Sequence, residues 1–240
     1  MRRVLVSLGI GASLIGAHAC GGAPLLPLAV AAARNAADAV RALLERGAAA
    51  DERDDRGVTA LMWAARSGAV DAIAVLLDAG ADPNARDAHH HWTPLLHALH
   101  RQQPAAVRLL LERGADPGMA TPAGVTPLMM AADDPEPSNV EQLLASGADP
   151  RVLGPGGRTA LTQAVSGGAF TDFTDRPLLG ACRPSTVRAL LAHDPALRLP
   201  DTFAGRQALW WARLNGCEEV VRLVDRVFDT AGWPSTNARQ

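Results

Sequence analysis

Apolar residues recur at helical spacing in short stretches along the chain. Within residues 59–84, Ile73, Leu76 and Leu77 fall on one face of a helix. This pattern stops at Gly80, and glycine tolerates the left-handed backbone conformation that closes a helix. The pattern predicts a short amphipathic helix that ends at this glycine.

A second, shorter helix is predicted before each of these amphipathic helices. Thr93 is followed by Pro94, and Thr126 by Pro127. Threonine is a common helix N-cap, and proline suits the first helical position, where its missing N–H costs nothing. The two helices of a pair leave an apolar flank that neither covers, so we expect each pair to stack on its neighbours.

Two series of landmarks repeat with one period. "TALMWAA", "TPLLHAL", "TPLMMAA" and "TALTQAV" begin at Thr59, Thr93, Thr126 and Thr159, at spacings of 34, 33 and 33 residues. Glycines 47, 80, 114 and 147 follow at intervals of 33, 34 and 33 residues. Two landmark series with the same period indicate a repeat protein, and the unit resembles the ankyrin repeat.

The resemblance implies an all-α ankyrin-repeat solenoid, in which helix-turn-helix units carry β-hairpin-like loops. We expect about six repeats in a domain over residues 20–229, followed by a loosely ordered tail over 230–240 with Trp233 as its only anchor. The expected units lie near 23–56, 57–87, 88–120, 121–153, 154–201 and 202–229.

The fifth and sixth units depart from the period. Gln207 stands in place of the repeated threonine in the sixth unit, 48 residues after Thr159. The excess predicts an insertion within residues 167–182, which contains Phe170 and Phe173. Two interpretations stay open: a binding loop, or two rings that fold back on the solenoid because exposed aromatic pairs are costly.

In ankyrin proteins the partner usually contacts the hairpin tips and the first helices on the concave side. The resemblance implies the same role for a strip of positions in this chain. The strip contains Asp55, Arg56, Val58, Arg66, Ser67, His89, His90, Trp92, His100, Arg101, Pro122, Val125, Asp133, Asp134, Arg158 and Ser166.

The third unit stands out in this strip. His91 replaces a family-typical glycine within "AHHHWT", and we expect this imidazole-rich tip to flank Asp133 and Asp134. Tryptophan and arginine are enriched at binding hot spots, so the concentration of Trp, His and Arg here favours a binding role. The usual histidine of the family's T-P-L-H motif is absent, which weakens the hydrogen bonding expected at each hairpin. Met62, Leu96, Met129, Thr162 and Trp210 occupy its positions.

The histidines raise a metal-binding alternative. Imidazole binds Zn, Cu or Ni, and five histidines lie close in sequence. They are His89, His90, His91, His97 and His100. Consecutive residues on a turn diverge, and no fixed ligand spacing joins these five, so a partner-contacting tip is favoured over a metal site. Neighbouring imidazoles also make a pH-sensitive contact conceivable.

Composition argues against catalysis and nucleic-acid binding. The chain has 23 basic residues, all of them arginine, and no lysine or tyrosine, which excludes a Schiff-base lysine and a P-loop. We expect no enzyme activity and no cofactor. Loss of Arg2 and Arg3 with the N-terminal segment would leave 21 arginines against 25 acidic residues, which is unfavourable for binding nucleic acid.

The first 19 residues have the three parts of a secretory signal peptide. Two arginines precede an apolar stretch, and Ala17-His18-Ala19 matches a cleavage site. Cys20 would then be the first mature residue, either in a plain periplasmic protein or as the lipidated cysteine of a lipoprotein, although Ala17 departs from the lipoprotein pattern. The arginine- and alanine-rich composition favours a bacterial origin.

Cys182 and Cys217 are a candidate disulfide in an oxidising compartment. The interpretation we favour is two buried, unpaired thiols, because neighbouring repeats usually hold equivalent positions too far apart to bridge.

Together these features predict a monomeric, exported scaffold that binds a protein partner in the bacterial cell envelope. The alternatives are a periplasmic metal-binding protein and a secreted effector that acts on another cell. The only membrane contact we expect is an N-terminal lipid anchor.

Overall fold

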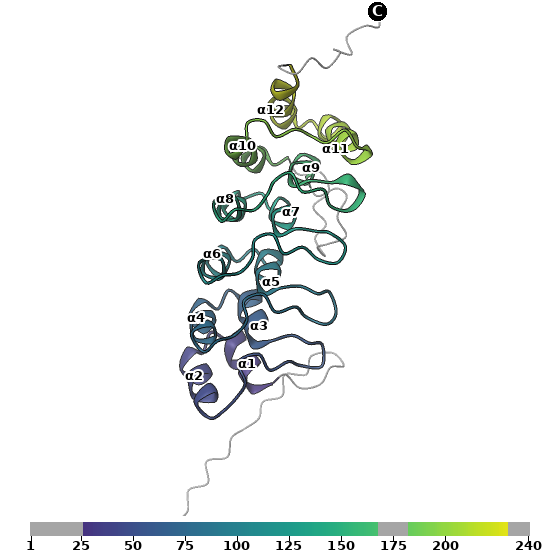
Figure 1. Cartoon of the computed structure of the whole chain (residues 1–240). Coiled ribbons are helices and arrows are strands. Elements are labelled where there is room, and N and C mark those ends of the chain that lie inside the picture. Colours follow the sequence, from purple (N-terminus) through teal and green to yellow (C-terminus); the bar gives the residue numbers. More distant parts are fainter. Residues whose placement is uncertain (1–25, 168–181, 230–240) are drawn as a thin grey trace, which may run out of the picture.

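The helices of the computed structural model form two parallel columns, and loops project from one side (Figure 1). The structure describes residues 26–167 and 182–229. The inner column contains α1 (Pro27–Ala33), α3 (Ala60–Ser67), α5 (Pro94–His100), α7 (Pro127–Ala131), α9 (Ala160–Ser166) and α11 (Phe203–Leu214). The outer column contains α2 (Ala37–Glu45), α4 (Val70–Asp78), α6 (Pro104–Glu112), α8 (Ser138–Ala145), α10 (Pro184–His193) and α12 (Glu218–Asp229).

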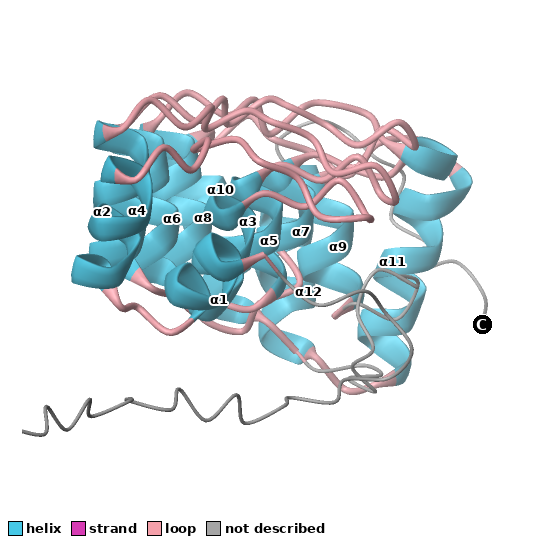
Figure 2. Ribbon diagram, turned by 90° about the horizontal axis from the view of Figure 1, so that it is seen from below, coloured by secondary structure: helices cyan, strands magenta, loops and turns pink. Residues whose placement is uncertain are grey.

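Each helix packs on the next helix of its own column and on its partner in the other column. A view along the stack shows the loops gathered along one edge (Figure 2). The short 3-10 helix η1 (Pro155–Gly157) belongs to one of these loops. One isolated antiparallel bridge, between Arg53 and Thr59, is the only β-pairing among the described residues. The predicted all-α solenoid is confirmed.

Repeated threonines begin the inner helices, as the sequence predicts. The hydroxyl oxygens of Thr59, Thr93 and Thr126 accept hydrogen bonds of 3.2 to 3.3 Å from the backbone N–H three residues on. This satisfies one of the donors that a helix start leaves without a partner. In two units the threonine N–H also donates to the side chain three residues on, from Thr159 N to Thr162 Oγ1 at 2.8 Å and from Thr59 N to Met62 Sδ at 3.4 Å.

The core is continuous along the stack because each unit repeats the same buried positions. Leu61, Leu95, Leu128 and Leu161 of the inner helices are at most 1 % exposed. The outer helices contribute pairs of residues that are 0 % exposed, namely Ile73 and Leu76, Val107 and Leu110, Val140 and Leu143, and Val187 and Leu190. The amphipathic face predicted for the second helix is the face that these pairs bury.

The start of the sixth unit differs from the prediction. Gln207 does not take the place of the capping threonine but lies inside α11, which begins at Phe203 after the N-cap Thr202. Thr202 Oγ1 accepts from Gly205 N at 3.2 Å. A Cβ at Gly205 would lie 2.1 Å from the carbonyl oxygen of Pro200, so glycine lets this early turn form against the preceding chain.

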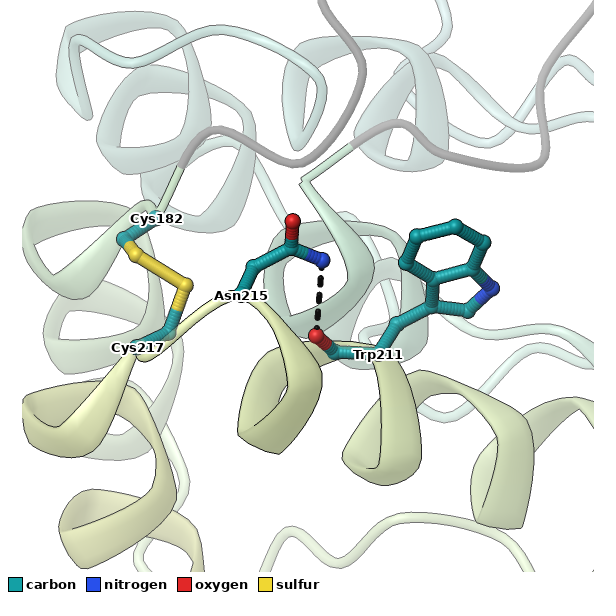
Figure 3. The surroundings of a disulfide bond; sticks show 4 residues. All are labelled: Cys182, Trp211, Asn215 and Cys217. Atoms are coloured by element: carbon teal, nitrogen blue, oxygen red, sulfur yellow. Dashed lines mark hydrogen bonds between the residues drawn. A yellow bond between two sulfur atoms is a disulfide. The ribbon is translucent and has the colours of Figure 1, made fainter.

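Cys182 and Cys217 form a disulfide with a Cα–Cα distance of 5.4 Å (Figure 3). The expectation of two unpaired thiols is therefore wrong. Cys182 precedes α10 and Cys217 precedes α12, and these two outer helices pack directly on each other. The two cysteines thus meet where consecutive units stack, within the usual Cα range of a disulfide.

Among the helices that the structure describes, none is long and apolar enough to span a lipid bilayer.

Candidate protein-binding surface

The hairpin loop of the third unit is one residue longer than the others. Asp87 N donates to Trp92 O at 3.0 Å, whereas Asp54 N donates to Val58 O at 3.1 Å in the second unit. The extra residue accounts for the spacing of 34 between two of the repeated threonines. His91 takes the left-handed conformation, with φ of 55°, at the place where the second unit has Gly57.

The buried carboxylate of Asp87 organises this longer hairpin. Asp87 is 2 % exposed, and its Oδ1 accepts from the backbone N–H of His89 at 3.0 Å and of His90 at 2.7 Å. Its Oδ2 lies 3.0 Å from Nε2 of His97, which is 7 % exposed. One side chain therefore fixes the tip of the loop and joins it to α5.

The electrostatic environment keeps Asp87 ionised. Burial alone would raise the pKa of this carboxyl. The hydrogen bonds from His97, His90 and His89, with the attraction to the His97 ring, outweigh burial and lower the pKa from 3.8 to about 2.

Trp92 lies at the centre of a group of imidazoles. Its ring centroid is 5.3 Å from that of His90, 5.5 Å from His97 and 5.0 Å from His100, and the His89 and His90 rings are 4.3 Å apart. We call these five residues the aromatic–imidazole cluster. His89 and His90 are exposed, Trp92 and His100 are half-buried, and His97 forms the buried base.

The second unit repeats this arrangement with different side chains. Trp63 occupies the place of His97, and its Nε1 donates to Asp54 Oδ2 at 3.3 Å. The guanidinium of Arg56 lies 5.6 Å from the centroid of the Trp63 ring. In these two units a hydrogen bond between hairpin and helix is made by Trp63 or His97, one residue after the position of the missing T-P-L-H histidine.

The sequence interpretation overlooked Asp54, Asp87 and Trp63 as parts of this surface. The signal was present, because the two aspartates are 33 residues apart and each precedes a helix with a ring N–H donor at its fourth residue. Their polar partners are visible only when hairpin and helix are seen together.

The strip of predicted contact residues divides by exposure. Arg56, His89, His90 and Arg101 are exposed, and Arg66, Trp92, His100 and Arg158 are half-buried. Val125, Asp134 and Ser166 are 2 %, 7 % and 3 % exposed, so their side chains do not belong to an open surface, and the strip must be corrected there.

Asp133 and Asp134 do not flank the histidine tip, contrary to expectation. They lie between α7 and α8, at the end of α7 that is opposite its hairpin. Asp133 Oδ1 is 3.6 Å from Arg183 Nη1, and the backbone carbonyl of Asp134 accepts from Thr186 Oγ1 at 3.0 Å. Both residues therefore lie at the junction with α10. The buried guanidinium of Arg183 needs hydrogen-bond acceptors at this junction.

No three His, Cys, Asp or Glu side chains within residues 26–167 and 182–229 form a group that could hold a metal ion. His97 is hydrogen-bonded to Asp87, the His90 and His100 rings lie against Trp92, and the His89 ring lies against His90. The structure therefore gives the metal-binding alternative no converged ligand set. Cys20, Phe170 and Phe173 lie outside the described residues.

Stacked helix pairs with loops along one edge define a helical repeat solenoid. A family model described as "Ankyrin repeats (3 copies)" matches residues 10–87, 28–121, 86–153 and 128–229. The chain therefore belongs to the ankyrin-repeat family. Ankyrin repeats are generally protein–protein interaction modules and typically have no catalytic role. A search of curated proteins returned no match.

Proposed function

We propose that this protein is an exported, non-catalytic scaffold of the bacterial cell envelope that binds a protein partner through the aromatic–imidazole cluster and the neighbouring Arg56 and Arg101. The observation that carries the proposal is an accessible tryptophan–histidine cluster on a hairpin that is fixed from within by Asp87.

The composition of the cluster supports a binding role. Tryptophan and arginine are over-represented among residues that dominate binding energy. Trp92, in the hairpin, is half-buried, Arg101 is exposed at the end of α5, and Arg56 is exposed one unit away. A partner that covers Trp92 would contact both the hairpin tip and α5.

The rigidity of the hairpin supports the same conclusion. A loop that must be ordered on binding loses part of the interaction free energy. Here three hydrogen bonds to Asp87 already hold the backbone of His89 and His90 and the ring of His97. The surface is therefore organised before a partner arrives.

The disulfide supports export. Disulfides persist in oxidising compartments and are rare where thiols are kept reduced. The Cys182–Cys217 bond, together with the signal-like first 19 residues, favours a periplasmic location. Within this proposal, the protein is anchored to the membrane if Cys20 carries a lipid and is free in the periplasm if it does not.

The test is affinity capture from the native host with the full chain tagged at its C-terminus. We compare the wild type, a Trp92→Ala/Arg101→Ala variant, and a matched control, Arg108→Ala, which removes an exposed arginine of the same unit on the outer helix α6. We expect one or more proteins to be captured by the wild type and the control and lost with the double variant.

Circular dichroism must first show that all three proteins are folded. Equal capture by the double variant and the wild type would reject the cluster as the binding surface.

Cell fractionation, with alkylation of free thiols before lysis, tests the location. Reduced cysteines in a cytoplasmic fraction would reject export.

A further inference from the structure

The carboxylates of Asp54 and Asp87 already have donors within their own units. Asp54 accepts at Oδ1 from two backbone N–H groups of its hairpin, at 3.0 and 2.9 Å, and at Oδ2 from Trp63 Nε1 at 3.3 Å. Asp87 is held in the same way, by two backbone N–H groups and by His97. Both carboxylates therefore hold hairpin and helix together, and neither pairs with an arginine of the described chain.

Two arginines beside these hairpins have no acidic partner among the described residues. Arg56 and Arg101 are exposed, and neither takes part in an ion pair there. The Arg56 guanidinium lies 5.6 Å from the centroid of the Trp63 ring. By contrast, Arg113 at the end of the outer helix α6 is paired, with its Nη1 2.6 Å from Asp78 Oδ1. The positive charges of Arg56 and Arg101 are therefore available to a partner.

The third unit is locally basic. Residues 86–101 contain two arginines and five histidines but a single acidic residue, the buried Asp87. Residues 117–132, which include the fourth hairpin and α7, contain no charged residue. The second hairpin adds the exposed Arg56 beside the exposed Asp55. The positive potential of this surface is therefore strongest over the third unit.

Backbone and ring contacts bring both cations close to Trp92. Ala88 N of the third hairpin donates to Arg56 O at 3.0 Å, so Arg56 borders the hairpin that carries Trp92. Arg101 follows His100, whose ring centroid is 5.0 Å from that of Trp92. Trp92 therefore has one exposed arginine near its hairpin and another near α5.

This arrangement fits a partner segment that carries carboxylates around an apolar side chain. A guanidinium can donate two parallel hydrogen bonds to a carboxylate, a geometry that arginine provides and lysine does not. An apolar side chain over the half-buried Trp92 would also exclude water from the neighbouring ion pairs, and the lower local dielectric strengthens them.

We propose that the partner binds here through an acidic polypeptide segment, whose Asp or Glu carboxylates pair with Arg56 and Arg101 while an apolar side chain covers Trp92. The inference rests on the proposed function, since it names the chemistry of the partner at the same surface. A nucleic acid fits less well, because the chain has 23 basic against 25 acidic residues and two exposed arginines neutralise few phosphates.

Selection of random peptides displayed on phage, with the full disulfide-bonded chain as the target, tests the chemistry of this surface. We expect the selected peptides to be enriched in Asp and Glu around an apolar residue. Fluorescence anisotropy of a selected peptide then compares the wild type with folded variants, as judged by circular dichroism. The variants are Trp92→Ala, Arg56→Glu/Arg101→Glu and a matched control, Arg108→Glu, at an exposed arginine of α6.

Reversal of both arginines should weaken binding of the acidic peptide by about tenfold or more, because two attractive ion pairs become repulsive. Arg108→Glu should leave the affinity unchanged. Added salt should weaken binding to the wild type. A peptide with lysine in place of its acidic residues should bind the reversed variant better than the wild type, a result that damage to the fold does not produce.

The outcomes separate this inference from the proposed function on which it rests. Peptides that require Trp92 but carry no excess of acidic residues, or that bind the reversed variant as well as the wild type, would overturn the inference and leave the binding surface in place. Selection of no peptide, or only of peptides that bind Trp92→Ala equally well, would reject the surface itself. Single-stranded DNA that competes as strongly as the free acidic peptide would overturn the assignment to a polypeptide.

Discussion

Asp87 is the single residue on which the geometry of the third hairpin depends most. Its carboxylate has a folded-state pKa of about 2, below the ordinary value of 3.8. A depressed pKa means that folding favours the ionised form, so the stabilisation is complete above pH 4 and is lost as the pH falls through 2. The shift corresponds to about 2 kcal/mol.

We therefore expect Asp87→Asn to lower the free energy of unfolding by about 2 kcal/mol at pH 7. The difference from the wild type should shrink between pH 4 and pH 2, because the wild type then loses the same charge. Urea unfolding at several pH values measures both curves. A difference that stays constant down to pH 2 would show that the charge of Asp87 is not what holds the hairpin.

His91 and Gly57 offer a matched pair of substitutions at one repeat position. His91 has φ of 55°, a conformation that glycine adopts freely, so His91→Gly should raise the free energy of unfolding by up to about 1 kcal/mol. Gly57→Ala should lower it by more than about 1 kcal/mol, because the position is left-handed and the new Cβ would lie 2.7 Å from Ala88 N. Thermal unfolding of the two variants beside the wild type tests whether the substitutions change the free energy of unfolding in opposite directions.

At the scale of the elements, the disulfide adds a covalent cross-link between the fifth and sixth units, besides the backbone that joins them. It closes a segment whose ends are 35 residues apart. A loop of this length corresponds to about 3 to 4 kcal/mol of stabilisation through the unfolded state. The link therefore matters most for α11 and α12, which pack on described helices on one side only.

Replacing both cysteines, as Cys182→Ala/Cys217→Ala, should increase hydrogen exchange in α11 and α12 while α3 and α4 keep their protection. A reducing agent should have the same effect on the wild type and none on the variant. Exchange that rises equally along the whole stack would contradict this localisation.

The sequence predicted most helices because each carries its own local signals. Thr93 with Pro94 marks a helix start, and Gly80 marks an end, through interactions within a few residues. The predicted start of α11, at Gln207, was wrong. The observed start, with its cap at Thr202 and its turn at Gly205, depends on the close approach of Pro200, which the repeat pattern does not contain. The roles of Asp87 and of the disulfide were hidden for the same reason, since both join segments whose relative position only the fold determines.

At the scale of the whole molecule, the contacts between the described helices join neighbouring units. Arg53 Nη1 donates to the carbonyl of Arg86 at 2.7 Å, and Arg86 Nη1 donates in turn to the carbonyl of Ala120 at 2.9 Å. Helices of one column likewise pack on the adjacent helix. The stability of such an array is approximately a sum of unit terms and nearest-neighbour terms.

This arrangement predicts that the same cavity has different consequences in the middle and near the end of the stack. Leu110 in α6 and Leu190 in α10 are both 0 % exposed, and truncation of either to alanine should cost about 2 to 5 kcal/mol. Leu110→Ala has folded units on both sides, so we expect one unfolding transition at a lower urea concentration. Leu190→Ala weakens the coupling of the last two units to the rest.

In Leu190→Ala, we therefore expect α10, α11 and α12 to lose protection from hydrogen exchange at urea concentrations where α3 to α6 remain protected. The disulfide does not prevent this, because Cys182 and Cys217 both lie on the C-terminal side of the weakened junction with α8. Exchange measured through a urea series reads each helix separately. A single transition in Leu190→Ala that includes α3 would mean that cooperativity extends over the whole stack. The coupling free energy between neighbouring units would then exceed the free-energy cost of the cavity.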